Sequence, residues 1–311
     1  MPAPLAPESH VTESLVPASL VTASRNPESL AAESPEPAAP SGRTALITGA
    51  TSGIGAEYAR QLASGGYALI LVARDAERLA ASAAAIGRRH GCSVETIAAD
   101  LATDAGVDQV VARLAEGRDR SDRFVDLLVN NAGFGTKGSL VAGDGVAQEA
   151  MVRLHVLAVH RLSDAALRPM VGRARGAIIT VSSVASYLTS PGNVNYCATK
   201  AYQRMAMEAL AREVSGRGVY VQAFCPGFTR TEFHARAALT TDPIPRVLWM
   251  EAETAVAISL AALAARRPTT VIPGFLNRAI VTLLGLLPRW LLSRGTRPYE
   301  STRAAGGAPS A

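Results

Sequence analysis

From Arg43 onward, short hydrophobic runs alternate with longer stretches in which hydrophobic residues recur every three or four positions. Most of the short runs are apolar at nearly every position, which is typical of parallel strands buried on both faces. The longer stretches have the period of amphipathic helices. The expected strands are Thr44–Thr48, Tyr67–Ala73, Val94–Ala99, Val125–Asn130, Ala177–Ser182, Val219–Phe224 and Thr269–Ile272. The expected helices are Ile54–Ala63, Ala76–Arg89, Gly106–Glu116, Gln148–Met170, Tyr196–Val214 and Ala252–Ala265.

This alternation predicts the α/β class, with the seven strands in one doubly wound parallel sheet of the Rossmann type and helices on both faces. A chain of 311 residues that is 48% hydrophobic is long enough to bury such a core. Its composition does not shift in the middle. We therefore predict a single domain over residues 43–274.

The two flanking segments differ from this pattern. Residues 1–42 are mostly Ala, Pro, Ser and Glu, with five Glu and one Arg, and are predicted to form a disordered low-complexity tail. Residues 275–311 form an apolar extension followed by a frayed tail. Its apolar part, 275–292, is interrupted by Arg278, Pro288 and Arg289 and is too short to span a bilayer. It has three interpretations: a cover over the substrate pocket, a peripheral membrane contact or a subunit contact.

Charge and cysteine content narrow the function classes. The net charge is +5 and the pI about 9.4, but no basic run is interleaved with aromatic residues, so nucleic-acid binding is not expected. The three cysteines, Cys92, Cys197 and Cys225, form no CxxC, and no HExxH occurs, so neither a disulfide framework nor a metal site is indicated. There is no secretory signal pattern at the start. These features favour a cytoplasmic protein.

The turn after the first expected strand is rich in glycine. It reads Gly49-Ala-Thr-Ser-Gly53-Ile-Gly55 and leads directly into a helix. Glycines allow a sharp turn and a close approach to a pyrophosphate, and the helix presents unpaired N–H groups to it. Glycine spacing alone also fits an ordinary strand-to-helix turn. The place after the first strand of an α/β alternation favours a dinucleotide site.

The end of the second strand bears on which nucleotide binds. NAD enzymes usually carry an acid there for the ribose hydroxyls, whereas this chain has Ala73 followed by Arg74. A guanidinium can hold a 2′-phosphate through paired charge-assisted hydrogen bonds, which favours NADP(H). The alternative is that Arg74 is a solvated loop residue, while Asp75 caps the next helix or holds the ribose.

Tyr196 and Lys200 lie four positions apart in an expected helix and so share one face. A phenol with a pKa of about 10 is a poor acid–base group at neutral pH, and a close ammonium would lower that pKa. Such a pair is more often a packing pair, but Lys200 is one of only two lysines in the chain. Ser183 follows an expected strand at the edge where parallel sheets place their sites, where its hydroxyl could hold a substrate oxygen.

Taken together, these residues resemble the short-chain dehydrogenase/reductase family over about Arg43–Gly274. Ser183 lies thirteen residues before Tyr196, as the family pattern requires. The stretch Thr48–Gly55 is similar to the family's nucleotide loop, and Asn130–Gly133 matches its NNAG element, which stabilises the sheet beside the cofactor. The cofactor-binding set that this resemblance implies is Gly49, Thr51, Ser52, Gly53, Ile54, Gly55, Arg74, Asp100, Leu101, Asn131, Ala132, Gly133, Tyr196, Lys200, Pro226, Gly227, Thr229 and Thr231.

The resemblance implies hydride transfer between NADP(H) and a carbonyl or alcohol. Tyr196 would exchange the proton with the substrate oxygen, Ser183 would position that oxygen, and Lys200 would bind the nicotinamide ribose and lower the Tyr196 pKa. The family usually has an Asn on the central helix where this chain has His155. In the family that residue helps to hold a water that joins the lysine to solvent. His155 therefore counts with the catalytic group, and a catalytically impaired or non-catalytic NADP-binding protein remains the alternative.

Substrate specificity in the family lies after the Pro-Gly element. Here that stretch runs from Glu232 to about Met250 and is mostly apolar, so it would form an apolar lid. Similarity to long-chain 3-oxoacyl and hydroxysteroid-type reductases favours a hydrophobic ketone. An epimerase or dehydratase is disfavoured because no large C-terminal substrate domain follows. The family commonly assembles through its central helices, so a homo-oligomer is expected.

Overall fold

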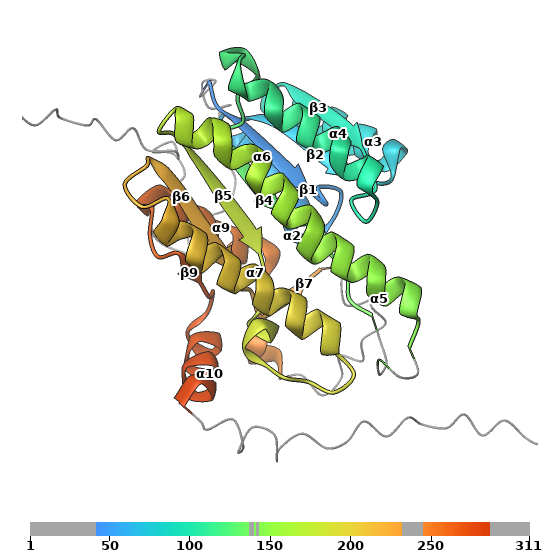
Figure 1. The fold of residues 1–311 in the computed structure, drawn as a ribbon, viewed down its shortest axis with the longest axis vertical. Coiled ribbons are helices and arrows are strands. Elements are labelled where there is room, and N and C mark those ends of the chain that lie inside the picture. Colours follow the sequence, from blue (N-terminus) through green and yellow to red (C-terminus); the bar gives the residue numbers. More distant parts are fainter. Residues whose placement is uncertain (1–41, 137–139, 141–142, 232–244, 287–311) are drawn as a thin grey trace, which may run out of the picture.

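The computed structural model describes residues 42–136, 140, 143–231 and 245–286, and it contains the expected seven-stranded parallel sheet (Figure 1). Its strands are β1 (Thr44–Thr48), β2 (Ala68–Ala73), β3 (Val94–Ala98), β4 (Leu127–Asn130), β5 (Gly176–Val181), β6 (Val219–Phe224) and β9 (Thr270–Val271). They lie in the order β3-β2-β1-β4-β5-β6-β9, and every neighbouring pair is parallel. The order reverses between β1 and β4, which opens a crevice at their carboxyl ends.

Helices cover both faces of this sheet. One face packs against α2 (Gly53–Ser64), α3 (Ala76–His90) and α9 (Ala252–Ala265). The other packs against α4 (Asp104–Ala115), α6 (Val159–Gly172) and α7 (Val194–Glu213), which lie in front of the sheet in Figure 1. Ala45 and Ile47 of β1 belong to the first core and Leu46 to the second, all fully buried. Burial on both sides explains why the central strands are apolar at most positions.

The long helix expected over Gln148–Met170 is not regular along its length. The structure has α5 (Gly145–Val152), a π-helical turn over Arg153–Ala158 and then α6. Asp144 caps the start of α5 by accepting hydrogen bonds from the backbone N–H groups of Val146 and Ala147. His155 lies within the π-helical turn, a type of irregularity that is frequent at functional sites.

A second, two-stranded sheet was not expected from the sequence. It pairs β7 (Phe228–Arg230) in parallel with β8 (Trp249–Glu251). The Phe228 and Trp249 rings lie 5.7 Å apart between centroids, and Arg230 pairs with Glu251 at 2.9 Å. Among the described connections, short 3-10 helices occur at Glu116–Arg118, Ser121–Arg123, Val184–Tyr187 and Arg246–Leu248.

The apolar C-terminal extension begins with α10 (Phe275–Leu286). Val281 is buried against the domain, whereas Phe275 and Leu286 are 80% and 78% exposed. In the described ranges, no helix is both long enough and apolar enough to cross a membrane. Of the two predicted flanking segments, 1–42 and 275–311, residues 1–41 and 287–311 lie outside the described residues. The membrane contact over 275–292, one of the three interpretations of the extension, stays a prediction.

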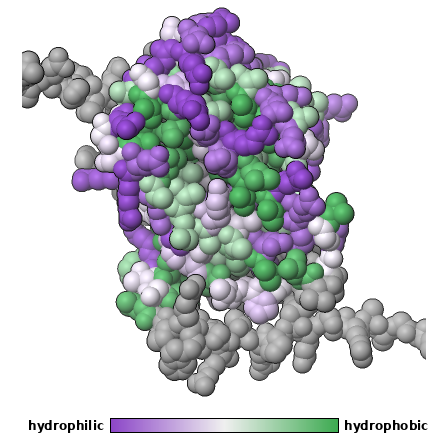
Figure 2. All heavy atoms as spheres, in the orientation of Figure 1, coloured by the Kyte–Doolittle hydropathy of each residue, from purple (hydrophilic) through white to green (hydrophobic). Residues whose placement is uncertain are grey.

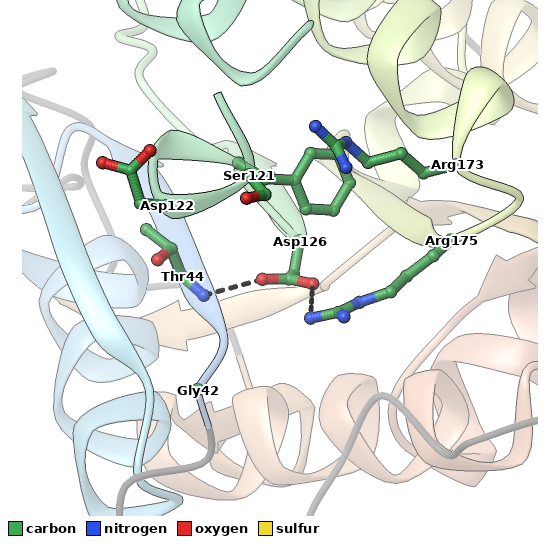
Figure 3. A pocket seen from close by; sticks show the side chains of 8 residues that line it. Gly42, Thr44, Ser121, Asp122, Asp126, Arg173 and Arg175 are labelled. Atoms are coloured by element: carbon green, nitrogen blue, oxygen red, sulfur yellow. Dashed lines mark hydrogen bonds and ion pairs between the residues drawn. The ribbon is translucent and has the colours of Figure 1, made fainter. Parts of the chain in front are cut away.

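A cavity of about 350 Å³ lies at the amino ends of β1, β4 and β5 (Figure 3). The Asp126 carboxylate accepts a hydrogen bond from the Thr44 N–H at 2.9 Å and pairs with Arg175. The Arg173 guanidinium lies 5.1 Å from the centroid of the Phe124 ring. These contacts join the first residue of β1 to the residues just before β4 and β5, at the edge of the sheet opposite the crevice.

Candidate active site

A second, larger cavity lies at the carboxyl ends of the central strands and has a volume of about 740 Å³. It collects nearly all of the residues that the sequence singled out, although they come from distant parts of the chain. Its walls include Gly49, Thr51, Ser52, Gly53, Ile54, Arg74, Asp100, Leu101, Asn131, Ala132, Gly133, Ser183, Tyr196, Lys200, Pro226, Gly227, Thr229 and Thr231. Of the expected site residues, Gly55 and His155 are not among its lining.

The glycine turn is shaped by close packing against Asn131. Gly49 has a φ of +66°, and a Cβ there would come within 2.9 Å of the Ala132 Cα. A Cβ on Gly55 would come within 2.3 Å of the Gly49 carbonyl oxygen. Asn131 Nδ2 donates to the carbonyl oxygens of Thr48 and Gly49 at 2.9 and 3.2 Å. Gly55 therefore allows the turn to close, and Asn131 ties it to β4.

The N-terminus of α2 completes this wall. The helix starts at Gly53, and residues 51–54 line the cavity. The first N–H groups of a helix have no partner within it, and they carry the positive end of the helix dipole. This end of the cavity is therefore built to receive an anion such as a pyrophosphate.

The structure shows that Asp75 caps the helix that follows it. Its carboxylate accepts a hydrogen bond from the Arg78 N–H at 2.9 Å and caps α3, so the capping interpretation is confirmed. Arg74 is exposed and lines the cavity. Asp100 also lines it, and its carboxylate accepts a hydrogen bond from the Ala102 N–H at 3.0 Å.

Ser183, Tyr196 and Lys200 are neighbours at the other end of the cavity. Ser183 follows β5 directly, its hydroxyl accepts a hydrogen bond from the Ala185 N–H at 3.1 Å, and it shares a hydrogen bond with the Tyr196 hydroxyl. Lys200 lies one turn beyond Tyr196 on α7, with Nζ 5.9 Å from the centroid of the tyrosine ring. A hydroxyl, a phenol and an amine thus converge where a substrate oxygen could bind.

Burial dominates the acid–base behaviour of this group. It raises the pKa of Tyr196 to about 12, although the hydrogen bond from Ser183 acts in the opposite direction. It lowers the pKa of Lys200 to about 7. The lowered Tyr196 pKa expected from the sequence is therefore not found in this structure, because desolvation outweighs the lowering effect of the Ser183 hydrogen bond.

His155 is fully buried, with both ring nitrogens bonded to the protein. Its Nε2 accepts a hydrogen bond from the Phe134 N–H at 3.2 Å, so Nδ1 carries the proton and donates to Thr199 Oγ1 at 3.0 Å. The Thr199 hydroxyl in turn donates to the Tyr196 carbonyl at 3.1 Å. Burial and the nearby Lys200 lower the His155 pKa well below its usual value, so the ring is neutral.

Gln203 is a buried polar residue that the sequence reasoning missed. Its Nε2 donates to the His155 carbonyl at 2.9 Å, and its Oε1 accepts from Lys200 Nζ at 3.0 Å. Lys200 Nζ also donates to the Val181 carbonyl at 2.8 Å. The spacing of three residues from Lys200 on one helix was the signal that could have revealed it.

The remaining wall of the cavity is mostly apolar and includes α10. Its apolar members include Phe134, Leu154, Leu188, Leu248, Ile280, Val281 and Leu284. Of the C-terminal extension, Asn277, Ile280, Val281 and Leu284 line this cavity, which is what the interpretation as a cover over the pocket predicts. Asn277, which sequence reasoning also missed, packs against Gly227, where a Cβ would lie 2.5 Å from its Nδ2. Of the expected lid, residues 232–244 lie outside the described residues.

A Rossmann-type sheet with a glycine turn, and a Ser–Tyr–Lys group at the same edge, define an oxidoreductase that uses a nicotinamide dinucleotide. The chain belongs to the short-chain dehydrogenase family, whose profile matches residues 43–241. Its reaction therefore acts on a CH–OH or C=O group.

Individual relatives agree with this assignment. Oxidoreductase UcpA of Escherichia coli (strain K12) is 34% identical over 206 residues, which cover 65% of this chain and 75% of the relative. A short-chain dehydrogenase from Sphingobium yanoikuyae, solved in complex with NADPH, is 34% identical with a TM-score of 0.71, over 84% of this chain and 98% of the other. A bulky-bulky ketone specific alcohol dehydrogenase from Comamonas testosteroni is 28% identical with a TM-score of 0.67, over 85% and 99% of the two chains.

Proposed function

We propose that this protein is an NADP(H)-dependent oxidoreductase that transfers hydride between nicotinamide and a hydrophobic ketone or the corresponding alcohol. The observation that carries the proposal is the convergence of Ser183, Tyr196 and Lys200 in the cavity that also contains the glycine turn and Arg74.

The residues present fit the dinucleotide. The close approach at Gly49 and the N-terminus of α2 form an anion-binding site for the pyrophosphate. Position 73 carries Ala instead of an acid that would repel a 2′-phosphate, and the exposed Arg74 beside it could bind that phosphate. Asp100 and Leu101 would border the adenine, and Pro226, Gly227, Thr229 and Thr231 the nicotinamide carboxamide. When bound, the dinucleotide supplies or accepts the hydride.

The catalytic group would then handle the proton. In reduction, Tyr196 donates its hydroxyl proton to the substrate oxygen, and its raised pKa keeps it protonated at neutral pH. Ser183 holds that oxygen by a hydrogen bond. Lys200, in its ammonium form, donates to the cofactor ribose and stabilises the phenolate that remains. In oxidation the phenolate takes the proton back.

The apolar wall supports a hydrophobic substrate. Leu188, Leu248 and Ile280 come from three separate segments and line the same cavity as Ser183 and Tyr196. A ketone with bulky apolar substituents would bury them against this wall, at about 25 cal/mol per Å² of apolar surface. The relative from Comamonas testosteroni, described as specific for bulky-bulky ketones, supports the same substrate class.

The outer surface supports assembly of several copies. Leu157 in the π-helical turn and Met205 on α7 are 48% and 60% exposed, and Tyr202 is also exposed. Figure 2 shows hydrophobic residues among the hydrophilic ones on the face that carries α4, α6 and α7. We propose a homo-oligomer through the central helices. Sedimentation equilibrium tests it, and a monomer at micromolar concentration would refute it.

The function is tested by NADPH oxidation with bulky ketones, aldehydes and 3-oxoacyl thioesters. Tyr196→Phe should lower kcat by roughly 100-fold or more, because the proton donor is lost, while the Kd for NADPH stays unchanged. Tyr202→Phe is the matched control, since Tyr202 is an exposed tyrosine on the same helix that does not line the cavity, and this variant should keep full activity.

Full activity of Tyr196→Phe would refute the mechanism. NADPH binding without turnover of any compound would instead favour the non-catalytic alternative. In that case, His155→Asn, which restores the residue usual in the family, should be assayed next.

A further inference from the structure

Gln203 lies on α7 behind the catalytic group and is only 1% exposed. Burying an amide is costly unless its polar atoms are hydrogen-bonded. Here the Nε2 donates to the His155 carbonyl and the Oε1 accepts from Lys200 Nζ. The amide thus bridges the π-helical turn and the catalytic lysine.

The π-helical turn offers a fixed anchor for this bridge. The His155 ring is held from both sides, by the Phe134 N–H and by Thr199 Oγ1. Its backbone carbonyl is therefore held at a set place relative to α7, and Gln203 spans from that carbonyl to Nζ. His155 therefore contributes to the site through its backbone carbonyl, which holds the Gln203 amide, while its ring bonds to Phe134 and Thr199 and not to Lys200.

The geometry around Nζ explains what the bridge does. An ammonium has three N–H donors, and two of them meet the carbonyl oxygen of Val181 and the Oε1 of Gln203. Two fixed acceptors set the rotation of the ammonium, which leaves one N–H for the cavity that Lys200 lines.

We propose that Gln203 is a positioning residue of the active site, which orients the Lys200 ammonium and supplies an acceptor that keeps it protonated. The proposal rests on the function proposed above for Lys200, but it requires no contact between Gln203 and the substrate or cofactor.

The surroundings of Lys200 make this acceptor important. The titratable groups that face it are the neutral ring of His155, the Tyr196 phenol and the Cys225 thiol. In the part of the chain that the structure describes, no carboxylate lies within ion-pair distance of Nζ. Since burial already lowers the Lys200 pKa to about 7, the loss of one acceptor would change its charge state near neutral pH.

The experiment measures the titration of Lys200 directly by NMR of protein labelled with ¹³C at the lysine Cε. The chain has only two lysines, so a Lys137→Arg background leaves Lys200 as the single signal. Gln203→Met keeps the length of the side chain but removes the acceptor, and should lower the midpoint by about one pH unit or more. Gln203→Glu places a carboxylate beside Nζ and should raise it by about 1–3 units.

Gln222→Met is the matched control. Gln222 is also a fully buried glutamine, but its amide bonds to the Tyr220 hydroxyl and the Ser259 carbonyl. Its loss should destabilise the fold without moving the Lys200 midpoint. In an active enzyme, the alkaline limb of kcat/KM should move in the same direction as the midpoint in each Gln203 variant.

An unchanged midpoint in both Gln203 variants would overturn the proposal. Failure of both variants to fold would also contradict it, since Gln203 would then support the fold rather than the site. A protein that binds NADPH but reduces no carbonyl compound would refute the proposed function, and the Lys200 titration would still decide the role of Gln203.

Discussion

Arg74 offers the sharpest test of cofactor choice, because one exposed side chain is expected to distinguish two dinucleotides. It follows β2 and lines the cavity, while the neighbouring Asp75 is engaged in capping α3. Hydrogen bonds to a charged group contribute about 1.5–3 kcal/mol, and solvent screening places an exposed guanidinium near the lower end. A loss of about 1.5 kcal/mol corresponds to roughly a tenfold weaker Kd. Arg74→Ala should therefore weaken NADPH binding about tenfold and leave NADH binding unchanged.

The assay is a fluorescence titration of both cofactors, repeated at low and high salt because screening should reduce the difference. Arg88→Ala is the matched control: it removes the same charge from the exposed far end of α3, about 20 Å along the helix. It should leave both affinities unchanged. Equal weakening of NADPH and NADH by Arg74→Ala, or no weakening of either, would refute the assignment of Arg74 to the 2′-phosphate.

Three further predictions concern stability and specificity. The Lys200 pKa is lowered to about 7, so the unfolded state binds more protons above that pH, and wild-type stability should gain from this group as pH rises from about 7 towards 10. Lys200→Met should lack that gain. Urea unfolding of both proteins at about pH 6 and pH 9 should therefore show that the free energy of unfolding of the variant falls relative to that of the wild type as the pH rises. The same difference between the two proteins at both pH values would contradict the lowered pKa. Asn131→Ala should cost roughly 1–3 kcal/mol in the same assay, because it removes two hydrogen bonds to the glycine turn, and an unchanged midpoint would show that the turn does not need them. Ile280→Phe should lower kcat/KM for bulky ketones by roughly tenfold or more relative to small ones, without affecting the Kd for NADPH, and equal rates for both sizes would place the substrate elsewhere.

The main sheet could be predicted because burial on both faces leaves a strong apolar signal. The expected bounds of β1 and β6 match the structure, and those of the other strands differ by one or two residues at one or both ends. The small sheet of β7 and β8 could not be predicted in this way. Each of its strands has three residues, and Arg230 and Glu251 interrupt any apolar pattern.

The site was predictable only as far as residue type and spacing carried the information. The positions of Ser183, Tyr196 and Lys200 after a strand and along one helix were enough to bring them together. The cap that Asp75 forms on α3 needed the structure, because the sequence alone allowed Asp75 either to cap that helix or to hold the ribose. The Gln203 bridge depends on a π-helical turn, and hydrophobic periodicity does not reveal one.

The amino-edge cluster around Asp126 has a consequence for how this scaffold can be altered. The first strand is anchored by the bond from the Thr44 N–H to a carboxylate supplied by the residue before β4, and that carboxylate is held by an arginine before β5. The starting register of the central strand is thus determined inside the domain. A tag, fusion partner or immobilisation linker attached before β1 should therefore leave the active site at the carboxyl ends of the strands undisturbed. Loops at those carboxyl ends can likewise be diversified without loosening the contacts between Thr44, Asp126 and Arg175.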